Sequence, residues 1–255
     1  MPPPADRQQA EKQLVAQAAV SLMQDGMQLA VGSGSTVAAF LQALGQAVRT
    51  TGLRVQATLA SRASEQQARA AGIPIQSPQR GLRFDLCLDG ADELDGQLQL
   101  IKGGGGALLR EKVLATAAAI RLILADSSKL VPALGRFPLP LEVVPFALPW
   151  VLDAVAALGA DPHLRVNAQD QPVLSDQANY LVDAAFGLIA EPAVLAMQLQ
   201  AIPGLVAHGL FLGLADAALL AHEGHLSLLR PGQPPLRVEH PQQLPALMSG
   251  LGRNL

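Results

Sequence analysis

A run of four glycines lies between a lysine and a glutamate. Lys102 precedes Gly103–Gly106, and Glu111 follows the last glycine by five residues. Glycine loses much conformational freedom on folding, so four in succession indicate that the backbone approaches another group closely. The next residues predict the start of a helix, whose free N–H groups and dipole favour an anion. We therefore expect an anionic ligand beside this run, with the carboxylate of Glu111 close to it.

Three further polar clusters each follow a predicted strand. Gly32–Thr36 carries three hydroxyls, Asp89–Asp95 carries four carboxylates, and Asp126–Lys129 ends in an ammonium. Predicted strands and helices alternate through this part of the chain, which is typical of a parallel, doubly wound sheet. Ligands bind at the carboxyl edge of such sheets, so we expect the clusters and the glycine run to form one polar pocket.

The two most polar clusters each allow more than one interpretation. Gly32–Thr36 lacks the third glycine of a dinucleotide fingerprint, because Val37 occupies that place, and it lacks the lysine of a P-loop. Its hydroxyls suit a phosphate monoester, with a plain polar turn as the alternative. The acidic cluster can hold a divalent cation, bind sugar hydroxyls or form a solvated turn. The nearby Lys102 favours a polar pocket over a metal site.

The lysines themselves are informative, because the chain has only four of them against fourteen arginines. A lysine kept in such a chain is a candidate for a position that needs a compact ammonium, although codon bias is an equal alternative for any one of them. The four are Lys12, Lys102, Lys112 and Lys129.

Other residues invite a functional reading but favour a structural one. The spacing of His222 and His225 resembles a metal pair without further ligands nearby. His208 and Cys87 lie in apolar strands and are expected to pack in the core. Trp150 is expected in the core or at a domain interface.

Composition excludes several classes of function. The 255 residues have a net charge of −3 and no basic tract, so we expect no nucleic-acid partner. The apolar runs are short or interrupted, which argues against a membrane span. The single cysteine excludes a disulfide framework. Residues 1–10 lack the pattern of a signal peptide, and we expect a cytoplasmic location.

After about residue 137 the predicted elements change to the order β-α-β-β-α-β, which is the ferredoxin-like split motif. Its predicted elements are strand 139–144, helix 149–158, strands 163–166 and 180–184, helix 192–201 and strand 205–212. We predict an α/β fold: a doubly wound, mostly parallel Rossmann-like domain (1–136 plus 213–255) with an inserted α+β ferredoxin-like domain (137–212). Strands 215–221 and 225–229 return to the larger sheet, and a surface-lying tail with a short helix ends the chain.

Taken in order, these clusters resemble ribose-5-phosphate isomerases of the A type. The resemblance rests on residues 32–36, 89–93, 102–112, 126–129, 137–143 and 202–211, and it covers roughly residues 11–230. Three features depart from the family pattern. Ser33 stands where threonine is usual, Ala178-Asn179 replaces Gly-Asn, and the last 25 or so residues have no counterpart that we can place.

The resemblance implies interconversion of D-ribose 5-phosphate and D-ribulose 5-phosphate through an enediolate, without metal or organic cofactor. By position, Glu111 matches the catalytic base, and Asp89, Asp92 and Lys102 match residues around the reacting end of the sugar. The implied catalytic residues are Glu111, Asp89 and Lys102. The implied substrate-binding residues are Lys12, Ser33, Gly34, Ser35, Thr36, Asp89, Gly90, Ala91, Asp92, Lys102, Gly103, Gly104, Gly105 and Lys129. Family members are usually homodimers or homotetramers.

Three rival classes have different signatures. An amino-sugar phosphate deaminase should have a histidine near its acidic pair, and none lies near Asp89–Asp95. An acyl-CoA transferase needs a glutamate that forms a thioester, which hydroxylamine would trap. A sugar-phosphate-sensing regulator should carry a DNA-binding helix-turn-helix, and no basic helical pair precedes Gly32.

Overall fold

The computed structural model describes residues 5–251, and residues 1–4 and 252–255 of the predicted larger domain lie outside this range. Within the described residues the largest sheet has seven strands. In order across the sheet they are β14 (Leu236–Val238), β13 (His225–Leu229), β12 (Ala217–His222), β6 (Ala118–Asp126), β3 (Phe84–Asp89), β1 (Gln28–Val31) and β2 (Gln56–Leu59). Five neighbouring strands run parallel to one another, and the two that come last in the chain, β13 and β14, pair antiparallel at one edge. The predicted doubly wound α/β fold is confirmed.

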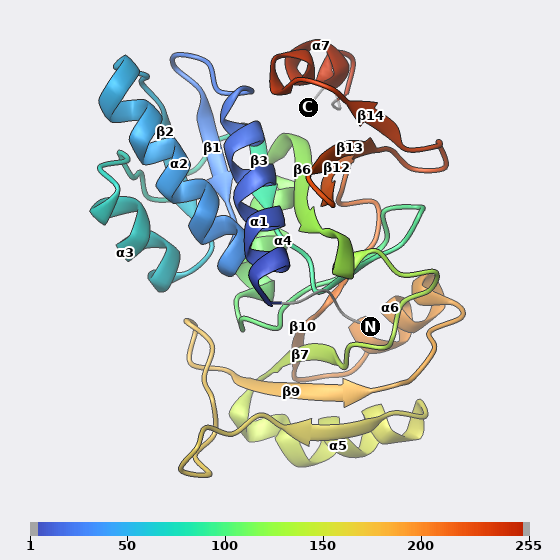
Figure 1. Cartoon of the computed structure of the whole chain (residues 1–255). Helices are drawn as coiled ribbons and strands as arrows, with labels where there is room; N and C mark the ends of the chain where they lie inside the picture. Colours follow the sequence, from blue (N-terminus) through green and yellow to red (C-terminus); the bar gives the residue numbers. More distant parts are fainter. Residues whose placement is uncertain (1–4, 252–255) are drawn as a thin grey trace.

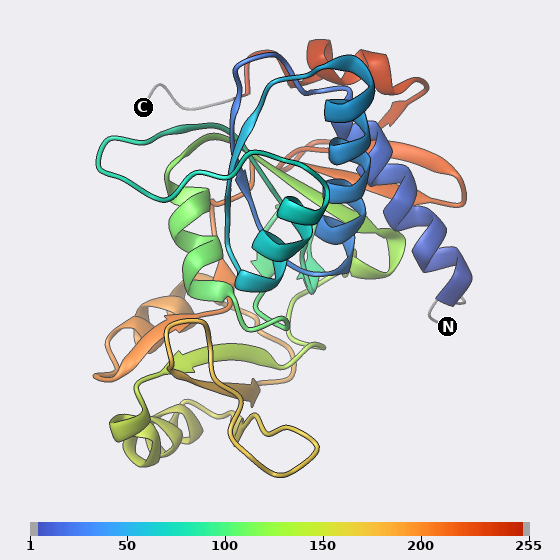
Figure 2. The same ribbon diagram turned by 90° about the vertical axis from the view of Figure 1, so that its left-hand side faces the viewer.

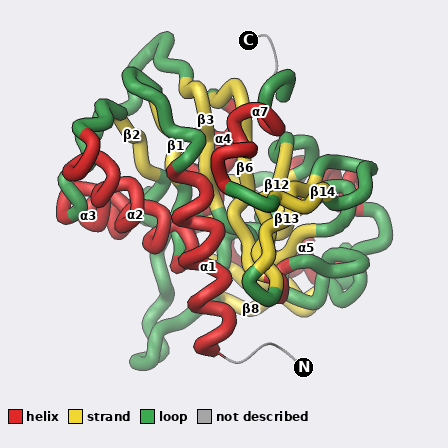
Figure 3. The backbone as a smooth tube through the Cα atoms, turned by 45° about the horizontal axis from the view of Figure 1, so that its top comes forward, coloured by secondary structure: helices red, strands yellow, loops and turns green. Residues whose placement is uncertain are grey.

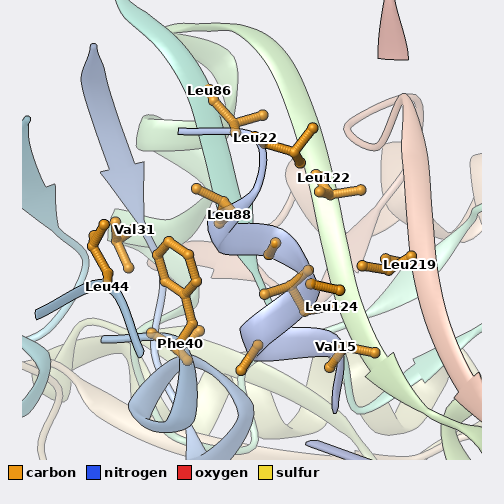
Figure 4. Packing of buried hydrophobic residues seen from close by; sticks show 14 of the residues in the cluster. Val15, Leu22, Val31, Phe40, Leu44, Leu86, Leu88, Leu122, Leu124 and Leu219 are labelled. Carbon is orange, nitrogen blue, oxygen red and sulfur yellow. The ribbon is translucent and has the colours of Figure 1, made fainter. Parts of the chain in front are cut away.

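Helices cover both faces of this sheet because buried side chains alternate along its strands. The helices are α1 (Ala5–Val20), α2 (Ser35–Thr51), α3 (Arg62–Ala70) and α4 (Leu108–Thr116). On β3, Leu86 and Leu88 join the core under α1 and α2, whereas Cys87 joins a separate cluster with Leu114 of α4. Figure 2 shows α4 on the opposite side of the sheet from α1 and α2. Figure 4 shows Phe40 of α2 within the first core.

A second sheet of four antiparallel strands lies beside the first (Figure 1). Its order is β10-β7-β9-β8, and two helices, α5 and α6, belong to the same part of the chain. This is the arrangement expected of a ferredoxin-like motif. The bounds are β7 (Leu139–Val143), α5 (Leu148–Ala157), β8 (Asp161–Leu164), β9 (Tyr180–Ala185), α6 (Pro192–Gln200) and β10 (Leu205–His208). The domain boundaries given above stay a prediction.

A third, small sheet between these two was not predicted. It pairs β4 (Glu93–Leu94), β5 (Leu100–Ile101) and β11 (Leu210–Phe211). The single strand predicted over 205–212 is therefore wrong: it breaks at Gly209, and its two halves join different sheets. A Cβ at Gly209 would lie 2.3 Å from the carbonyl oxygen of Lys102, so only glycine allows the chain to turn there.

The C-terminal tail and several element ends also differ from the prediction. The tail forms β14, η3 (Pro241–Gln243) and α7 (Leu244–Met248), and Leu244 and Met248 are buried in the core that α1 covers. Most of the tail is exposed and it contains the predicted short helix, but Val238, Leu244 and Met248 anchor it to the core. Figure 3 shows α7 and β14 beside the large sheet. Trp150 has 63% of its side chain exposed, so it is not a core residue. Helix α1 begins at Ala5, and β8 is two residues earlier than predicted.

The remaining short elements are η1 (Ser127–Lys129) and η2 (Pro145–Ala147). No helix within residues 5–251 combines the length and the apolar character needed to cross a membrane.

Ala178, which stands where the family has glycine, still forms a tight turn, but in a backbone conformation that is unfavourable for alanine. Its φ is 61°, in the left-handed region that favours glycine, and its N–H donates to the carbonyl of Ser175 at 2.9 Å. This conformation costs a non-glycine residue about 1–2 kcal/mol of folding free energy. Glycine avoids that cost but loses more backbone entropy on folding, which offsets part of the gain. We predict that Ala178→Gly raises the free energy of unfolding by about 0.5–1 kcal/mol in urea titrations. Ala168→Gly, in the same connection without a positive φ, should not stabilise the protein; equal effects of the two would contradict the argument.

Candidate functional site

The predicted site residues come together at the carboxyl edge of the large sheet, in one pocket. All but Asp89 line it, and Asp89 is buried directly beneath. The lining residues are Lys12, Ser33, Gly34, Ser35, Thr36, Gly90, Ala91, Asp92, Lys102, Gly103, Gly104, Gly105, Glu111 and Lys129. Three of the four lysines in the sequence therefore face one small cavity.

Close backbone approach explains the first glycine cluster. A Cβ at Gly32 would lie 1.8 Å from Oδ1 of Asp89, so any other residue would displace that carboxylate. The same Oδ1 accepts hydrogen bonds from the N–H of Gly90 at 2.8 Å and of Ser33 at 3.3 Å. These contacts fix the loop between β1 and α2 against the end of β3, and the N-terminus of α2 then faces the pocket.

Lys102 occupies the centre of the site, between two carboxylates. Its Nζ lies 2.9 Å from Oδ2 of Asp89 and 3.3 Å from Oε2 of Glu111, and all three side chains are 95% or more buried. Nζ also donates to the carbonyl of Gly90 at 2.7 Å. One buried ammonium thus faces two carboxylates, which leaves one negative charge of the cluster without a cation.

The two oxygens of Glu111 have different surroundings. Oε1 accepts a hydrogen bond from Oγ of Ser33 at 2.7 Å. Within residues 5–251, Oε2 is buried and accepts no hydrogen bond, although it lies near the ammonium of Lys102. Ser33 thus fixes the orientation of the carboxylate and leaves Oε2 with unused acceptor capacity. The hydroxyl that serine shares with the usual threonine is the group used here.

The charge imbalance shifts the protonation of the cluster. Burial, reinforced by the charge of Glu111, raises the pKa of Asp89 to about 7. Burial alone would lower the pKa of Lys102, but Asp89 and Glu111 outweigh it and raise the pKa above its usual range, so the ammonium stays charged. Burial also raises the pKa of Asp92. The pKa of Asp89 therefore lies near neutral pH, far above that of an ordinary aspartate.

The acidic cluster does not act as a unit. Oδ2 of Asp92 accepts the N–H of Gly104 at 2.7 Å and lines the pocket. Glu93 points elsewhere: it is 1% exposed and accepts the N–H groups of Gly135 and Phe137 at 2.8 and 2.7 Å. Asp95 caps its own turn. Among the described residues no three acidic, histidine or cysteine side chains are grouped to hold a metal ion.

Sequence reasoning missed Glu11, which holds the loop that carries Lys129. Its carboxylate is 2% exposed and accepts the N–H and Oγ of Ser127 at 3.0 and 2.8 Å, and the N–H of Glu223 at 3.1 Å. Burial opposes its ionisation, but these donors outweigh burial and hold the pKa of Glu11 below its usual value. Its place beside Lys12 on α1 was the only available signal.

Sequence reasoning also missed Phe211, which lies beneath the site. Its ring centroid is 5.5 Å from Nζ of Lys102 and 4.8 Å from Nζ of Lys112. Lys112 lies outside the pocket and donates to the carbonyls of His208 and Leu210 at 2.7 and 3.0 Å. Burial lowers the pKa of Lys112 to about 8, and burial with the charge of Lys112 lowers the pKa of His208 to about 4. These residues support the floor of the site, and His208 packs as expected.

The raised pKa of Asp89 gives a test by pH. A carboxyl with a folded pKa above its unfolded value of 3.8 contributes stability below about pH 4 that is lost as pH rises through about 7. We predict that the free energy of unfolding of wild type falls over this range relative to that of Asp89→Asn, measured by urea titration at several pH values. Asp153→Asn, at an exposed position of α5, should follow wild type. Parallel curves for wild type and Asp89→Asn would show that Asp89 does not titrate there.

The contacts of Glu11 predict a second effect on stability. Glu11→Gln places an amide donor among N–H groups that need an acceptor, and an unsatisfied buried donor costs about 1–3 kcal/mol. We predict a loss of that size in urea unfolding. Glu223→Gln changes a side chain that is 61% exposed and should stay within about 0.5 kcal/mol of wild type. Similar effects of the two changes would mean that the Glu11 carboxylate does not hold the loop.

Comparisons with known proteins find relatives that match most of the chain. The family model described as ribose 5-phosphate isomerase A (phosphoriboisomerase A) matches residues 57–225. A ribose-5-phosphate isomerase A from Synechococcus sp. is 46% identical over 221 residues, which cover 86% of this chain and 96% of the relative.

Solved structures with the same family name superpose on most of the chain. Ribose 5-phosphate isomerase A from Methanocaldococcus jannaschii is 34% identical with a TM-score of 0.83, and the match covers 87% of this chain and 98% of that one. A D-ribose-5-phosphate isomerase in complex with phospho-erythronic acid is 32% identical with a TM-score of 0.84, over 87% and 98% of the two chains.

Proposed function

Because this chain belongs to the ribose 5-phosphate isomerase A family, we propose that the pocket around Glu111 is where it interconverts D-ribose 5-phosphate and D-ribulose 5-phosphate. The chain is an isomerase, and its fold is that of the solved family members. The observation that carries the assignment of the site is the buried Glu111 beside Lys102, at the edge of a pocket lined by backbone N–H groups and two further lysines.

Glu111 is the base in this proposal. Aldose–ketose isomerisation moves a proton between C2 and C1 of the open-chain sugar, and a positioned carboxylate performs such transfers. Oε2 is suited to take the proton, because it accepts no hydrogen bond from residues 5–251 while Ser33 holds Oε1. Removal of the proton from C2 gives an enediolate with its charge on O1. Return of the proton to C1, together with transfer of the hydroxyl proton from O2 to O1, gives the ketose.

The negative charge of the enediolate needs fixed positive groups. The ammonium of Lys102 stays charged and lies 3.3 Å from the base, so it can bind an oxygen on the reacting carbons. The glycine run lines the same wall, and the N–H of Gly105 there donates to no group among residues 5–251. Such preorganised donors stabilise charge that develops in the transition state. Asp89, with its pKa raised to about 7, is suited to exchange the proton needed to open the sugar ring, and Asp92 orients hydroxyls.

The phosphate of the substrate is assigned to the other end of the pocket. Ser35 and Thr36 begin α2, where free N–H groups and the helix dipole favour an anion. Lys12 and Lys129 line the same part of the pocket from α1 and η1. Binding the phosphate there holds the reacting carbons against Glu111.

The setting of the enzyme is also part of the proposal. The net charge of −3 and the sugar-phosphate substrate fit a cytoplasmic enzyme without a nucleic-acid partner. We assign it a homodimeric or homotetrameric state, as is usual in the family. The division into a larger domain (1–136 plus 213–255) and an inserted one (137–212) follows the two main sheets.

Replacement of the base tests the assignment of the site. Glu111→Gln keeps the size of the side chain but removes the base, so we predict a fall in kcat of about 10²–10⁴-fold with substrate affinity within a few-fold. Ribulose 5-phosphate formation by chelator-treated protein is the measurement, which also tests independence from metal ions.

Lys129→Ala serves as the matched control, because it removes a charge at the phosphate end and leaves the base in place. It should raise KM with a smaller effect on kcat. Near-normal turnover by Glu111→Gln would show that another group moves the proton.

A further inference from the structure

The part of the chain that forms the four-stranded sheet contributes a side chain to the glycine loop. Arg165 follows β8, and its NH1 donates to the carbonyl of Gly104 at 2.9 Å while its NH2 lies 3.5 Å from the carbonyl of Gly103. Asp183 of β9 holds the guanidinium from the other side, with Oδ2 2.8 Å from Nε and Oδ1 2.5 Å from NH2. A bidentate pair of this kind fixes the direction of the guanidinium.

The two carbonyl contacts determine where the N–H groups of the loop point. In a planar trans peptide the C=O and N–H point to opposite sides, and residues 5–251 contain no cis peptide. In the first peptide, the carbonyl of Gly103 accepts the N–H of Gly106 at 2.9 Å and lies 3.5 Å from Arg165, and the N–H of Gly104 donates to Asp92 at 2.7 Å. The second also places its C=O on Arg165, so the N–H of Gly105 points away from the arginine.

The N–H of Gly105 is placed for the substrate. Gly105 lines the pocket, and a Cβ there would lie 3.5 Å from Oγ of Ser33, the hydroxyl that binds Glu111. None of the hydrogen bonds formed among residues 5–251 uses this N–H. A donor beside the base, without a protein acceptor, is available to a substrate oxygen.

We propose that Arg165 is a positioning residue, which holds two carbonyls of the glycine loop so that the N–H of Gly105 donates to the oxygen that becomes negative in the enediolate. The inference rests on the proposed function of the pocket. Consecutive glycines adopt many conformations. The turn bond from Gly106 to Gly103 and the bond from Gly104 to Asp92 restrain the first peptide, and Arg165 restrains the second, whose N–H belongs to Gly105. Preorganisation of this kind lowers the barrier, because the donor need not reorient as charge develops.

The backbone at Arg165 is held independently of its side chain. The N–H of Arg165 donates to the carbonyl of Leu181 at 2.8 Å, and its carbonyl accepts from Val173 at 2.9 Å. Truncation of the side chain therefore leaves these pairings in place. Arg62 supplies a matched control: it also bridges the two parts of the chain, through Asp176 at 3.8 Å, but is 73% exposed.

Arg165→Met is the primary test. We expect kcat to fall about 10–100-fold, with KM within about threefold of wild type. Affinity for inorganic phosphate should stay unchanged, because the phosphate end of the pocket is retained. Affinity for phospho-erythronic acid should fall, because its carboxylate presents negative charge at the reacting end. Arg62→Gln should match wild type in all four measurements.

Two conservative variants keep the test decisive if Arg165→Met folds poorly. Arg165→Lys cannot bind Asp183 and both carbonyls at once, and Asp183→Asn loosens the guanidinium, so each should lower kcat less than Arg165→Met does. The proposal is overturned if kcat of these variants equals that of Arg62→Gln, or if phosphate affinity falls as much as kcat.

The two proposals fail in distinguishable ways. Near-normal turnover by Glu111→Gln would show that Glu111 is not the base, whatever the kcat of Arg165→Met. An inactive Glu111→Gln beside a fully active Arg165→Met would remove only the positioning role.

Discussion

The site depends on one buried ammonium placed between two carboxylates. Lys102 contacts Asp89 and Glu111 in surroundings from which water is nearly excluded. Burying an unpaired charge is costly, so an arrangement with one cation too few persists only where the fold fixes its members by other bonds. The N–H groups of Gly90 and Ser33 donate to Asp89, and the carbonyl of Gly90 accepts a hydrogen bond from Lys102. The resulting imbalance allows Asp89 to take up a proton near neutral pH and keeps Lys102 charged.

The rest of the molecule holds loops against this cluster. Parallel strands bring the loops to one edge, but each loop is then held by a side chain from another part of the chain. Glu11 of α1 binds the loop of Lys129, Glu93 binds residues 135–137, and Arg165 binds the carbonyl of Gly104. These side chains do not line the pocket, yet each pairs with backbone groups of a loop. The precision of the site is thus distributed over both main sheets.

The pocket residues were predictable from sequence because they are local clusters at strand ends, and alternation of strands with helices places such ends together. The residues that hold the loops and the base of the pocket could not be predicted: they are Glu11, Arg165 and Phe211. Their partners are distant in sequence or belong to another sheet. No local sequence pattern indicates that an arginine will bind a glycine carbonyl. The break at Gly209 escaped prediction for a related reason. A single glycine within the mostly apolar segment 205–212 is compatible with one strand, and the turn follows from the close approach of the Lys102 carbonyl, which is distant in sequence. The tail lies mostly at the surface with its short helix, as its prolines suggested, but the burial of Leu244 and Met248 in the core could not be predicted from that pattern.

The first and last strands of the four-stranded sheet, β7 and β10, are neighbours. The chain enters and leaves that sheet near Pro140 and Gly209, where the N–H of Gly209 donates to the carbonyl of Pro140 at 2.7 Å. A segment whose two ends meet can be gained, lost or exchanged during evolution without cutting the sheet that receives it. Here such an exchange would leave every pocket residue in place and still remove the guanidinium that restrains the glycine loop. The four-stranded sheet is therefore separable in topology, yet it supplies a side chain, Arg165, that restrains a loop of the pocket.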